Sequence, residues 1–406
     1  MKILQVNNYH YLRGGAETVY FQTSEILEKQ GHEVIHFSTQ NKKNVSSKTS
    51  KYFIKERSYL NKSLLEKVKS SSGFVYSHES AKKIDQLIKE QKPDIAHLHI
   101  FFGQLSSSIL KVLKKHKIPV VMTVHEYKML CPTYLMIRTD GTICEKCADG
   151  NYISCIKYKC NKGNTVFSTL MATESFVRDE FIPYEKYIDE FIFVSKFIYN
   201  KHMEYKPLLK NKSRVIYNAF GNTVKAYNNR MYFLYVGRLS KEKGILTLIK
   251  AMEKFPNKKL IIVGEGPQHK ELQDYILLKD LKNIDLIGYK SGESLNNLYQ
   301  HADFLFMPSE WYETFGMTIL ESFSFGKPVA ISNIGGMPEV IKNESNGFVF
   351  EPANQASLEN VIERIIGLSQ ETYNEMGLSC IKRVKQFNIE KYYSELIDVY
   401  SGLIDH

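Results

Sequence analysis

Short apolar segments alternate with helix-length segments along most of this 406-residue chain. The strand candidates of its first half, mostly Val/Ile-rich, are "KILQV" (2–6), "HEVIHFS" (32–38), "DIAHLHI" (94–100), "PVVMTVH" (119–125) and "EFIFVS" (190–195). Strands buried on both faces of a parallel sheet have this composition, and helices connect them. The alternation therefore predicts an α/β fold built on a doubly wound parallel sheet.

The same pattern stops once and then begins again. Polar residues and Gly fill residues 219–230, as in a linker. The strand candidates that follow are "MYFLYVGRLS" (231–240), "KLIIVGEGP" (259–267), "NIDLIGY" (283–289), "HADFLFMPS" (301–309) and "KPVAISN" (327–333). A chain of this length exceeds what one hydrophobic core usually supports.

We therefore predict two Rossmann-like domains that face each other across a cleft. The first domain is expected at residues 1–220 and the second at residues 221–385. The amphipathic segment 386–406 is expected to be a helix that packs back toward the first domain. Ligands of such sheets bind beyond the carboxyl ends of the strands, so both domains would offer loops to one ligand.

Composition and charge narrow the class of protein. Hydrophobic residues at 43% and charged residues at 24% are typical of a soluble globular protein. The apolar part of "MKILQVNN" is too short for a signal peptide, so a cytoplasmic location is expected. Lys and Arg exceed Asp and Glu by ten. Most of these lysines are expected only to aid solubility. The basic and aromatic stretch Lys48–Ser72 is the exception, and it suits peripheral contact with the anionic inner face of a membrane.

Two carboxylates flank a predicted helix start in "EWYETFGMTILE" (310–321). Glu313 precedes a helix that would begin near Phe315-Gly316, and Glu321 lies inside it. Free backbone N–H groups at a helix start attract phosphate, and Gly316 has no side chain to keep an anion away. A nucleoside-diphosphate sugar matches this order, with sugar hydroxyls at one carboxylate and ribose hydroxyls at the other. The alternative is an ordinary acid that stabilises the helix dipole.

Two cations in "VGRLSKEKG" (236–244) complement the acidic pair. Arg238 and Lys243 lie in the loop that follows a predicted strand of the same domain. Fixed cations directed at a diphosphate stabilise the charge of a leaving group without a divalent metal. The alternative is a solvent-exposed basic loop. The occurrence of both cations together with the acidic pair favours the diphosphate site.

These segments carry a family resemblance over nearly the whole chain. The segments are "RGGAE" (13–17), "TVHEY" (123–127), "VGRLSKEKG", "VGEGP" (263–267), "PSEWYETFGMTILESFSFGKPV" (308–329) and "IGGMPEVI" (334–341). The chain resembles the GT-B glycosyltransferases of the retaining family called group 1, or family 4. The E-x7-E segment is the specific part of this match, whereas "GGAE" or "VGEGP" alone is weak.

The resemblance implies roles for individual residues. Glu313, His125, Arg238 and Lys243 would form the catalytic set: Glu313 holds the transferred sugar, the two cations neutralise the diphosphate and His125 lies near the reacting sugar. Glu265 and Ile287 would belong to the wall around the nucleobase. The donor-binding residues would be Gly14, Gly15, Gly264, Gly288, Tyr289, Phe315, Gly316, Met317, Thr318 and Glu321. His97 and His99 are expected to be packed strand histidines and not catalysts.

The implied reaction is transfer of a sugar from a UDP- or GDP-type donor to an acceptor hydroxyl, with retention at the anomeric carbon. In the front-face account, the leaving phosphate deprotonates the acceptor, and the protein supplies position and charge stabilisation. A covalent route through Glu313 stays open. The first domain would bind the acceptor, which by analogy is a glycan or lipid-linked oligosaccharide of cell-envelope polysaccharide synthesis.

Five of the six cysteines fall within the segment 131–160. Disulfides are uncommon in a reducing cytosol, whereas four thiolates that include a C-x-x-C pair suit zinc. We predict a structural zinc held by Cys144, Cys147, Cys155 and Cys160, with Cys131 as a possible substitute for one of them. Free buried thiols and an iron–sulfur cluster are the alternatives. This insertion is expected to shape acceptor recognition and not the chemistry.

Two rival functions remain open from sequence. One rival is another enzyme of the same fold, a sugar-nucleotide epimerase or a phosphorylase; an epimerase needs acid–base groups around the sugar ring and no acceptor. A zinc-dependent nucleic-acid-binding protein would place its basic residues around the cysteines. This rival gives no reason for the positions of Glu313, Glu321 and Arg238, so no nucleic-acid partner is expected.

Overall fold

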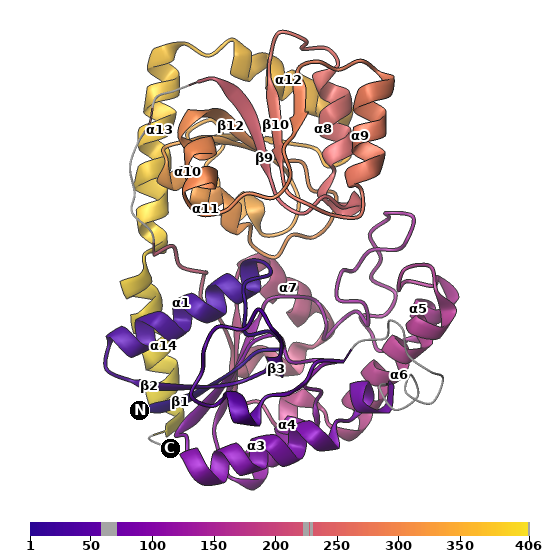
Figure 1. Cartoon of the computed structure of the whole chain (residues 1–406), viewed down its shortest axis with the longest axis vertical. Coiled ribbons are helices and arrows are strands. Elements are labelled where there is room, and N and C mark those ends of the chain that lie inside the picture. The colour runs from indigo at the N-terminus through magenta and orange to yellow at the C-terminus, as the bar shows by residue number, and fades with distance from the viewer. Residues whose placement is uncertain (58–70, 222–226, 228–229, 405–406) are drawn as a thin grey trace. The chain divides into compact units, whose positions relative to one another are not determined.

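The computed structural model describes residues 1–57, 71–221, 227 and 230–404. The chain divides into two compact units, which are described separately (Figure 1). Unit 1 comprises Met1–Ala219 and Ile389–His406, and unit 2 comprises Phe220–Asn388. Residues 58–70, within the basic and aromatic stretch, and most of the polar segment at 222–229 lie outside the described residues.

Unit 1 is built on a six-stranded parallel sheet with the order β2-β1-β5-β6-β7-β8. Its strands are β1 (Lys2–Val6), β2 (Glu33–Phe37), β5 (Ile95–Leu98), β6 (Val120–Val124), β7 (Glu190–Phe193) and β8 (Ser213–Val215). Its helices are α1 (Gly15–Lys29), α3 (His78–Gln91), α4 (Ser108–Lys115), α5 (Ile153–Lys157), α6 (Thr165–Phe181), α7 (Lys196–Tyr205) and α14 (Ile389–Ile404). A separate parallel pair joins β3 (Thr39–Gln40) to β4 (Ile54–Lys55), and short 3₁₀ turns include η1 (Ser50–Tyr52).

The last helix, α14, belongs to the core of unit 1. Its apolar face, which includes Leu396 and Val399, packs with Leu27 of α1 and with residues of β1, β5, β6 and β7. The hydroxyl of Tyr400 also hydrogen-bonds Nδ1 of His97, at 2.6 Å, in the interior. A helix from the end of the sequence therefore covers the sheet formed by its beginning.

Unit 2 repeats the architecture with the strand order β11-β10-β9-β12-β13-β14, again parallel throughout. Its strands are β9 (Tyr232–Val236), β10 (Leu260–Val263), β11 (Ile284–Leu286), β12 (Ala302–Met307), β13 (Val329–Ser332) and β14 (Gly347–Phe350). Its helices are α8 (Ile245–Met252), α9 (His269–Leu278), α10 (Gly292–His301), α11 (Met317–Ser324), α12 (Gln355–Ile366) and α13 (Gln370–Val384). Phe304 and Phe306 of β12 lie in a core formed with α8, α9 and α12.

The predicted fold class is confirmed: each unit has a Rossmann-like parallel sheet with helices between its strands. The sequence prediction lacked one edge strand in each sheet, β8 and β14. Both are short: β8 has three residues with little apolar character, and the apolar run of β14 is only four residues long. Among the described residues, every helix is too short or too polar to cross a membrane.

Candidate functional site

The start of α11 has the backbone geometry expected of an anion site. Gly316 precedes the helix with φ +96°, a conformation that side chains other than that of Gly rarely adopt. A Cβ at Gly316 would lie 3.0 Å from Cδ1 of Ile319. The first N–H groups of the helix, from Met317 and Thr318, have no intrahelical acceptor. The eight-residue helix thus begins where the sequence predicts, with Glu313 before it and Glu321 within it.

Glu313 is buried, with its side chain held by two donors. Lys243 donates to Oε1 of Glu313, and the hydroxyl of Ser309 donates to the same oxygen at 2.8 Å. Burial acts to raise the pKa of Glu313, but the Lys243 ammonium and these hydrogen bonds hold it below its ordinary value. Glu313 is therefore an anion near neutral pH, ready to accept hydrogen bonds from hydroxyls.

A glycine turn fixes the backbone of Glu313. The N–H of Gly336 donates to the carbonyl of Glu313 at 2.7 Å. Gly335 has φ +68°, and a Cβ there would lie 2.2 Å from the same carbonyl oxygen. Only glycine fits so close to another backbone segment. The "IGGMPEVI" segment therefore positions Glu313, a role that local sequence spacing did not reveal.

The loop after β9 is fastened to the loop that carries Glu313. Gly244 ends the 3₁₀ turn η4 (Lys241–Lys243), and a Cβ at Gly244 would lie 1.9 Å from the carbonyl oxygen of Pro308. The N–H of Glu310 donates to the carbonyl of Glu242 at 2.8 Å. These contacts bring Lys243 to Glu313, so the two residues form one structural unit.

The two predicted cations differ in their surroundings. Lys243 is half-buried, with its ammonium 5.3 Å from the ring centroid of Trp311. Arg238 is exposed, and its carbonyl accepts a hydrogen bond from the hydroxyl of Tyr235 at 3.0 Å. Among the described residues, the Arg238 guanidinium has no hydrogen-bond or ion-pair partner. Its charge is thus open to an anionic ligand.

Glu321 is held by an aromatic partner from α10. The hydroxyl of Tyr299 donates to Oε2 of Glu321 at 2.8 Å, and the Tyr299 ring stacks on Phe325 at 5.5 Å between centroids. Burial raises the pKa of Glu321, which the Tyr299 hydrogen bond partly offsets. Tyr299, like Ser309, is a supporting residue that the sequence prediction missed.

The residues predicted for the nucleobase wall lie in neighbouring loops. The N–H of Gly264 donates to the carbonyl of Gly288 at 3.0 Å. Gly264 has φ +143°, and a Cβ there would lie 1.8 Å from the carbonyl oxygen of Gly237. Tyr289 follows with 71% of its surface exposed. The loops after β9, β10 and β11 are thus closely packed, and the tyrosine ring is accessible.

The other predicted site residues belong to unit 1. Gly14 is the residue before α1, and Gly15 is the first residue of that helix. His125 follows β6, with Nε2 2.9 Å from Nδ1 of His99. Burial lowers the pKa of His125 to about 3, so its imidazole is neutral near pH 7. Each unit is described separately, so the roles implied for these residues stay predictions.

The packing predicted for His97 and His99 is confirmed. His97 and His99 are buried, with ring centroids 4.4 Å apart. Nε2 of His97 lies 2.7 Å from the hydroxyl of Thr123, and Nε2 of His99 lies 2.9 Å from the side-chain oxygen of Gln5. Burial lowers the pKa of both. Both are therefore neutral, hydrogen-bonded residues of the interior.

The cysteine-rich segment folds around a small apolar cluster. Cys147 and Cys155 are buried together with Tyr152 and Ala172, and Cys160 packs against them. All six cysteines of the chain are free thiols. Across the described ranges, no three Cys, His, Asp or Glu side chains are arranged as a metal-binding group. The zinc site therefore stays a prediction.

A buried charge network joins α6 to Lys128, in the loop just before the cysteine-rich segment. Glu174 lies 2.8 Å from the ammonium of Lys128 and 3.5 Å from the guanidinium of Arg178, and all three side chains are at most 4% exposed. Arg178 also pairs with Asp179 at 2.8 Å. Such a network is stable only when complete, because each charge is removed from water.

Comparison with known families decides the class of both units. Residues 222–383 match the family model described as glycosyl transferases group 1, and residues 13–140 match that of glycosyltransferase family 4. Both segments are glycosyltransferase domains. The Lys243–Glu313 pair and the start of α11 thus lie in the group 1 domain, and Gly14, Gly15 and His125 lie in the family 4 domain.

Curated relatives agree with these domains. Two uncharacterized glycosyltransferases of Methanocaldococcus jannaschii are 32% identical over 45% of this chain and 47% of their own length, and 28% identical over 83% and 84%. An uncharacterized 42.6 kDa protein in the cps region of Klebsiella pneumoniae is 25% identical over 86% of this chain and 90% of its own.

Solved structures share the fold of the glycosyltransferase domains over their full length. The Anabaena protein HepE in complex with UDP-glucose aligns with a TM-score of 0.69 at 20% identity, covering 99% of this chain and 100% of the other. A glycosyltransferase from Rickettsia africae aligns with the same TM-score at 18% identity, covering 99% and 98%. Both establish a likeness of fold.

Proposed function

We propose that this chain moves a sugar from a nucleoside-diphosphate sugar to an acceptor hydroxyl, with retention at the anomeric carbon. The observation that carries the proposal is the contact between Lys243 and Glu313 beside the start of α11. A buried carboxylate, a cation and free helix amides at one place provide partners for sugar hydroxyls and for phosphate.

The geometry of the group 1 domain suits a diphosphate leaving group. Arg238 and Lys243 would oppose the charge that develops on the diphosphate as the glycosidic bond breaks. The amides of Met317 and Thr318 supply further positive potential without a side chain. In the front-face mechanism that we favour, the leaving phosphate accepts the proton of the acceptor hydroxyl. The protein then needs no strong base, consistent with Glu313 being held as a paired anion.

We infer that the donor carries a uridine or guanosine diphosphate, with Glu321 accepting hydrogen bonds from the ribose. The fold-related HepE binds UDP-glucose, which supports testing UDP sugars first. Residues Gly264, Gly288 and Tyr289 are proposed to line the base. No divalent metal is proposed for the reaction, because the two cations provide the charge.

We place the acceptor on the family 4 domain and assign it to glycans or lipid-linked oligosaccharides of the cell envelope. The support is the relative encoded in a cps region. The cysteine-rich segment, with its proposed structural zinc, would contribute to acceptor recognition. The thiols of Cys147, Cys155 and Cys160 are of the right chemical type, and they already lie in one cluster.

A panel of nucleoside diphosphates and nucleotide sugars, added to the purified chain in a thermal-shift assay, tests donor binding. A ligand that binds only the folded state raises Tm, by an amount that grows with its concentration over Kd. The account predicts a rise with UDP or GDP and their sugars, and none with AMP. NMR of the product then reports the anomeric configuration. Incubation with donor alone identifies an epimerase, because an epimerase converts the donor into an epimeric nucleotide sugar, whereas a transferase can only hydrolyse it.

A further inference from the structure

The excess of basic over acidic residues in this protein is confined to unit 1. Unit 2 contains 19 Lys or Arg and 19 Asp or Glu, whereas unit 1 contains 35 and 25. Within unit 1, residues 48–117 contain fifteen basic and six acidic side chains. Nine of the ten excess positive charges thus fall on that one segment, a distribution that a general need for solubility does not explain.

The described part of this segment forms one side of unit 1. It comprises η1, β4, α3, β5 and α4, and α3 and α4 lie side by side (Figure 1). Strand β5 is buried in the sheet, so the charged side chains come from η1, β4, α3, α4 and their flanking turns. We call this surface the basic face. Its exposed lysines are Lys48, Lys51, Lys55, Lys82, Lys89, Lys92, Lys111, Lys114, Lys115 and Lys117.

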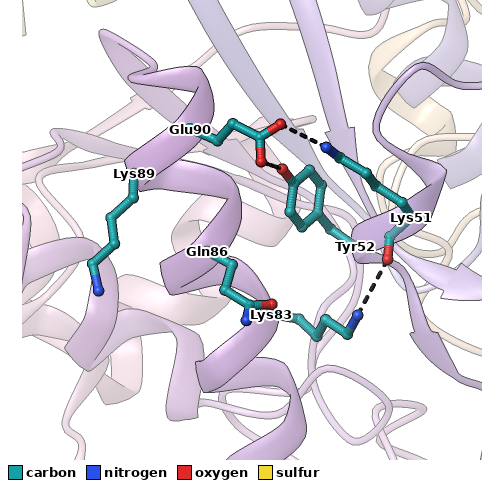
Figure 2. A pocket seen from close by; sticks show the side chains of 6 residues that line it. All are labelled: Lys51, Tyr52, Lys83, Gln86, Lys89 and Glu90. Carbon is teal, nitrogen blue, oxygen red and sulfur yellow. Dashed lines mark hydrogen bonds and ion pairs between the residues drawn. The ribbon is translucent and has the colours of Figure 1, made fainter.

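Contacts on the basic face leave an excess of ammonium groups. Lys51 pairs with Glu90 at 2.6 Å, and Lys83 donates to the carbonyl of Lys51 at 3.2 Å, as Figure 2 shows. Asp85 is shared by Lys89, at 2.6 Å, and Lys115, at 3.6 Å. Two carboxylates thus pair with three lysines, and Lys83 has only a carbonyl acceptor within the described ranges, so the contacts do not neutralise the face.

The remaining exposed lysines of the basic face have no ion pair with any described residue. Lys114 donates to the carbonyl of Lys186 at 2.8 Å, and Lys111 lies 5.9 Å from the ring centroid of Tyr76. Neither contact removes charge. These side chains keep their ammonium groups in water, where they respond to any extended negative surface.

The surface of the basic face is hollowed between η1 and α3. A shallow, open cavity of about 640 Å³ is lined by Lys51, Tyr52, Lys83, Gln86, Lys89 and Glu90 (Figure 2). Glu90 accepts hydrogen bonds from both Lys51 and the Tyr52 hydroxyl, and Lys89 pairs with Asp85, so of the lysines at the cavity Lys83 has no carboxylate partner among the described residues. Phosphate groups of lipid headgroups match this combination of shape and charge.

We propose that the basic face of unit 1 docks on the surface of an anionic lipid bilayer. The exposed cations here are lysines, which act as hydrated point charges and suit a diffuse negative potential. Among the described residues of η1, α3 and α4, no large apolar side chain is exposed. The docking is therefore electrostatic and reversible, and it does not involve insertion into the hydrocarbon.

A nucleic acid is the other extended anion to consider, and the basic face fits it less well. Proteins that bind nucleic acids usually combine cations with accessible aromatic rings or with arginine forks. Here Tyr52 is buried, and Arg57 is committed to the carbonyl of Gly103 and the hydroxyl of Ser77. The bilayer is thus the partner that the chemistry favours.

Vesicle co-sedimentation of the full chain tests this inference. Vesicles of phosphatidylcholine are compared with vesicles that contain about 30% phosphatidylglycerol, at about 0.05 M and about 0.5 M salt. The triple variant Lys82→Gln, Lys83→Gln, Lys89→Gln neutralises the α3 side of the basic face. The matched control, Lys270→Gln, Lys279→Gln, Lys282→Gln, removes three exposed lysines from unit 2.

The expected result is binding to anionic vesicles only, lost at high salt. Each lysine near such a surface contributes about fivefold in partitioning, so the α3 variant should bind at least about tenfold more weakly and the control should match wild type. No binding at low salt, or equal weakening in both variants, would overturn the proposal. So would tighter, variant-sensitive binding to a duplex DNA probe. The inference does not rest on sugar transfer, since Glu313→Gln is expected to keep full vesicle binding.

Discussion

The ammonium group of Lys243 contacts the carboxylate of Glu313, although the two residues lie seventy positions apart in the chain. Parallel strands β9 and β12 are neighbours in the sheet, so the loops after them meet at the same edge. Gly244 and Pro308 then bring these loops into backbone contact. The pair is therefore a product of the fold, placed at the start of α11.

Removal of either member of the pair should abolish most transfer activity while the protein stays folded. Lys243→Ala removes a cation from the leaving group, and Glu313→Gln removes the anion that holds sugar hydroxyls. Loss of one such electrostatic contact costs about 10²- to 10³-fold in kcat. Turnover of a labelled nucleotide sugar measures the effect. Lys241→Ala is the matched control, because Lys241 is exposed in the same 3₁₀ turn, and it should keep near-normal activity.

The same pair predicts a dependence of stability on pH. The pKa of Glu313 lies lower in the folded than in the unfolded chain, so its stabilising effect is complete above the ordinary carboxyl pKa of 4.5. That effect is lost as the pH falls through the folded value. The difference in Tm between wild type and Glu313→Gln should therefore be constant from pH 7 to about pH 5 and shrink below that. A difference that grows on acidification would contradict the assignment.

Gly335 should be essential because of its closeness to Glu313. In Gly335→Ala, the new Cβ would lie 2.2 Å from the Glu313 carbonyl oxygen, so the Glu313 backbone must move. Gly292→Ala is the matched control: Gly292 also has positive φ, but nothing lies within 4 Å of its Cβ position. Each variant carries a backbone strain of about 1–2 kcal/mol, but only Gly335→Ala should lose activity at least about tenfold. Equal activity of the two variants would show that the turn does not position Glu313.

Glu321 should affect the donor KM more than kcat, because ribose contacts are alike in the ground and transition states. Glu321→Gln is expected to raise the donor KM about tenfold or more, because loss of a hydrogen bond to a charged group weakens binding by about that factor. Tyr299→Phe removes the hydroxyl that orients Glu321 and should act in the same direction, more weakly. Tyr275→Phe removes a similar bond to the Glu253 carboxylate elsewhere in unit 2, and it should leave KM unchanged.

The helix start and the two carboxylates of the proposed donor site could be predicted from sequence because their signals are local. Glu313, Gly316 and Glu321 lie within nine residues, and the spacing of an acid, a glycine and a helix is visible without coordinates. The partners of these residues are not local. Tyr299 comes from the preceding helix and Gly335 from the loop after β13, and only the strand order brings them to the site.

The charge of the chain shows the same limit. The sequence locates the excess of basic residues at positions 48–117, but it does not show that their side chains share a surface. The fold adds that unit 2 is neutral and that the described lysines of this segment come from neighbouring elements on one side of unit 1. The edge strands β8 and β14 escape prediction because they have only three and four residues, and their pairing with β7 and β13 is what identifies them.

The buried network around Glu174 should dominate the stability of unit 1. Glu174→Gln leaves Lys128 and Arg178 with too little negative charge in the interior, and breaking such a pair costs about 3–5 kcal/mol. Glu25→Gln breaks the exposed pair with Lys29 in α1 and should cost under about 1 kcal/mol. Calorimetric unfolding of both variants compares them. Similar losses would mean that the network is not the anchor of α6.

The cysteine-rich segment gives a prediction about metal content. Protein purified without chelator should contain about one zinc per chain, the stoichiometry of a four-thiolate structural site. Replacement of Cys147 by Ser should lower that content and the Tm, whereas replacement of the distant Cys380 should leave the metal content unchanged. Elemental analysis that finds no zinc in fresh protein removes the zinc prediction and leaves the donor site unaffected.

The most direct test of the account is a crystal structure of the chain with UDP or GDP bound. The account predicts the diphosphate at the N–H groups of Gly316, Met317 and Thr318, with Arg238 and Lys243 in contact with its oxygens and Glu321 on the ribose. A nucleotide bound elsewhere on the molecule, with the start of α11 free of phosphate, would contradict it.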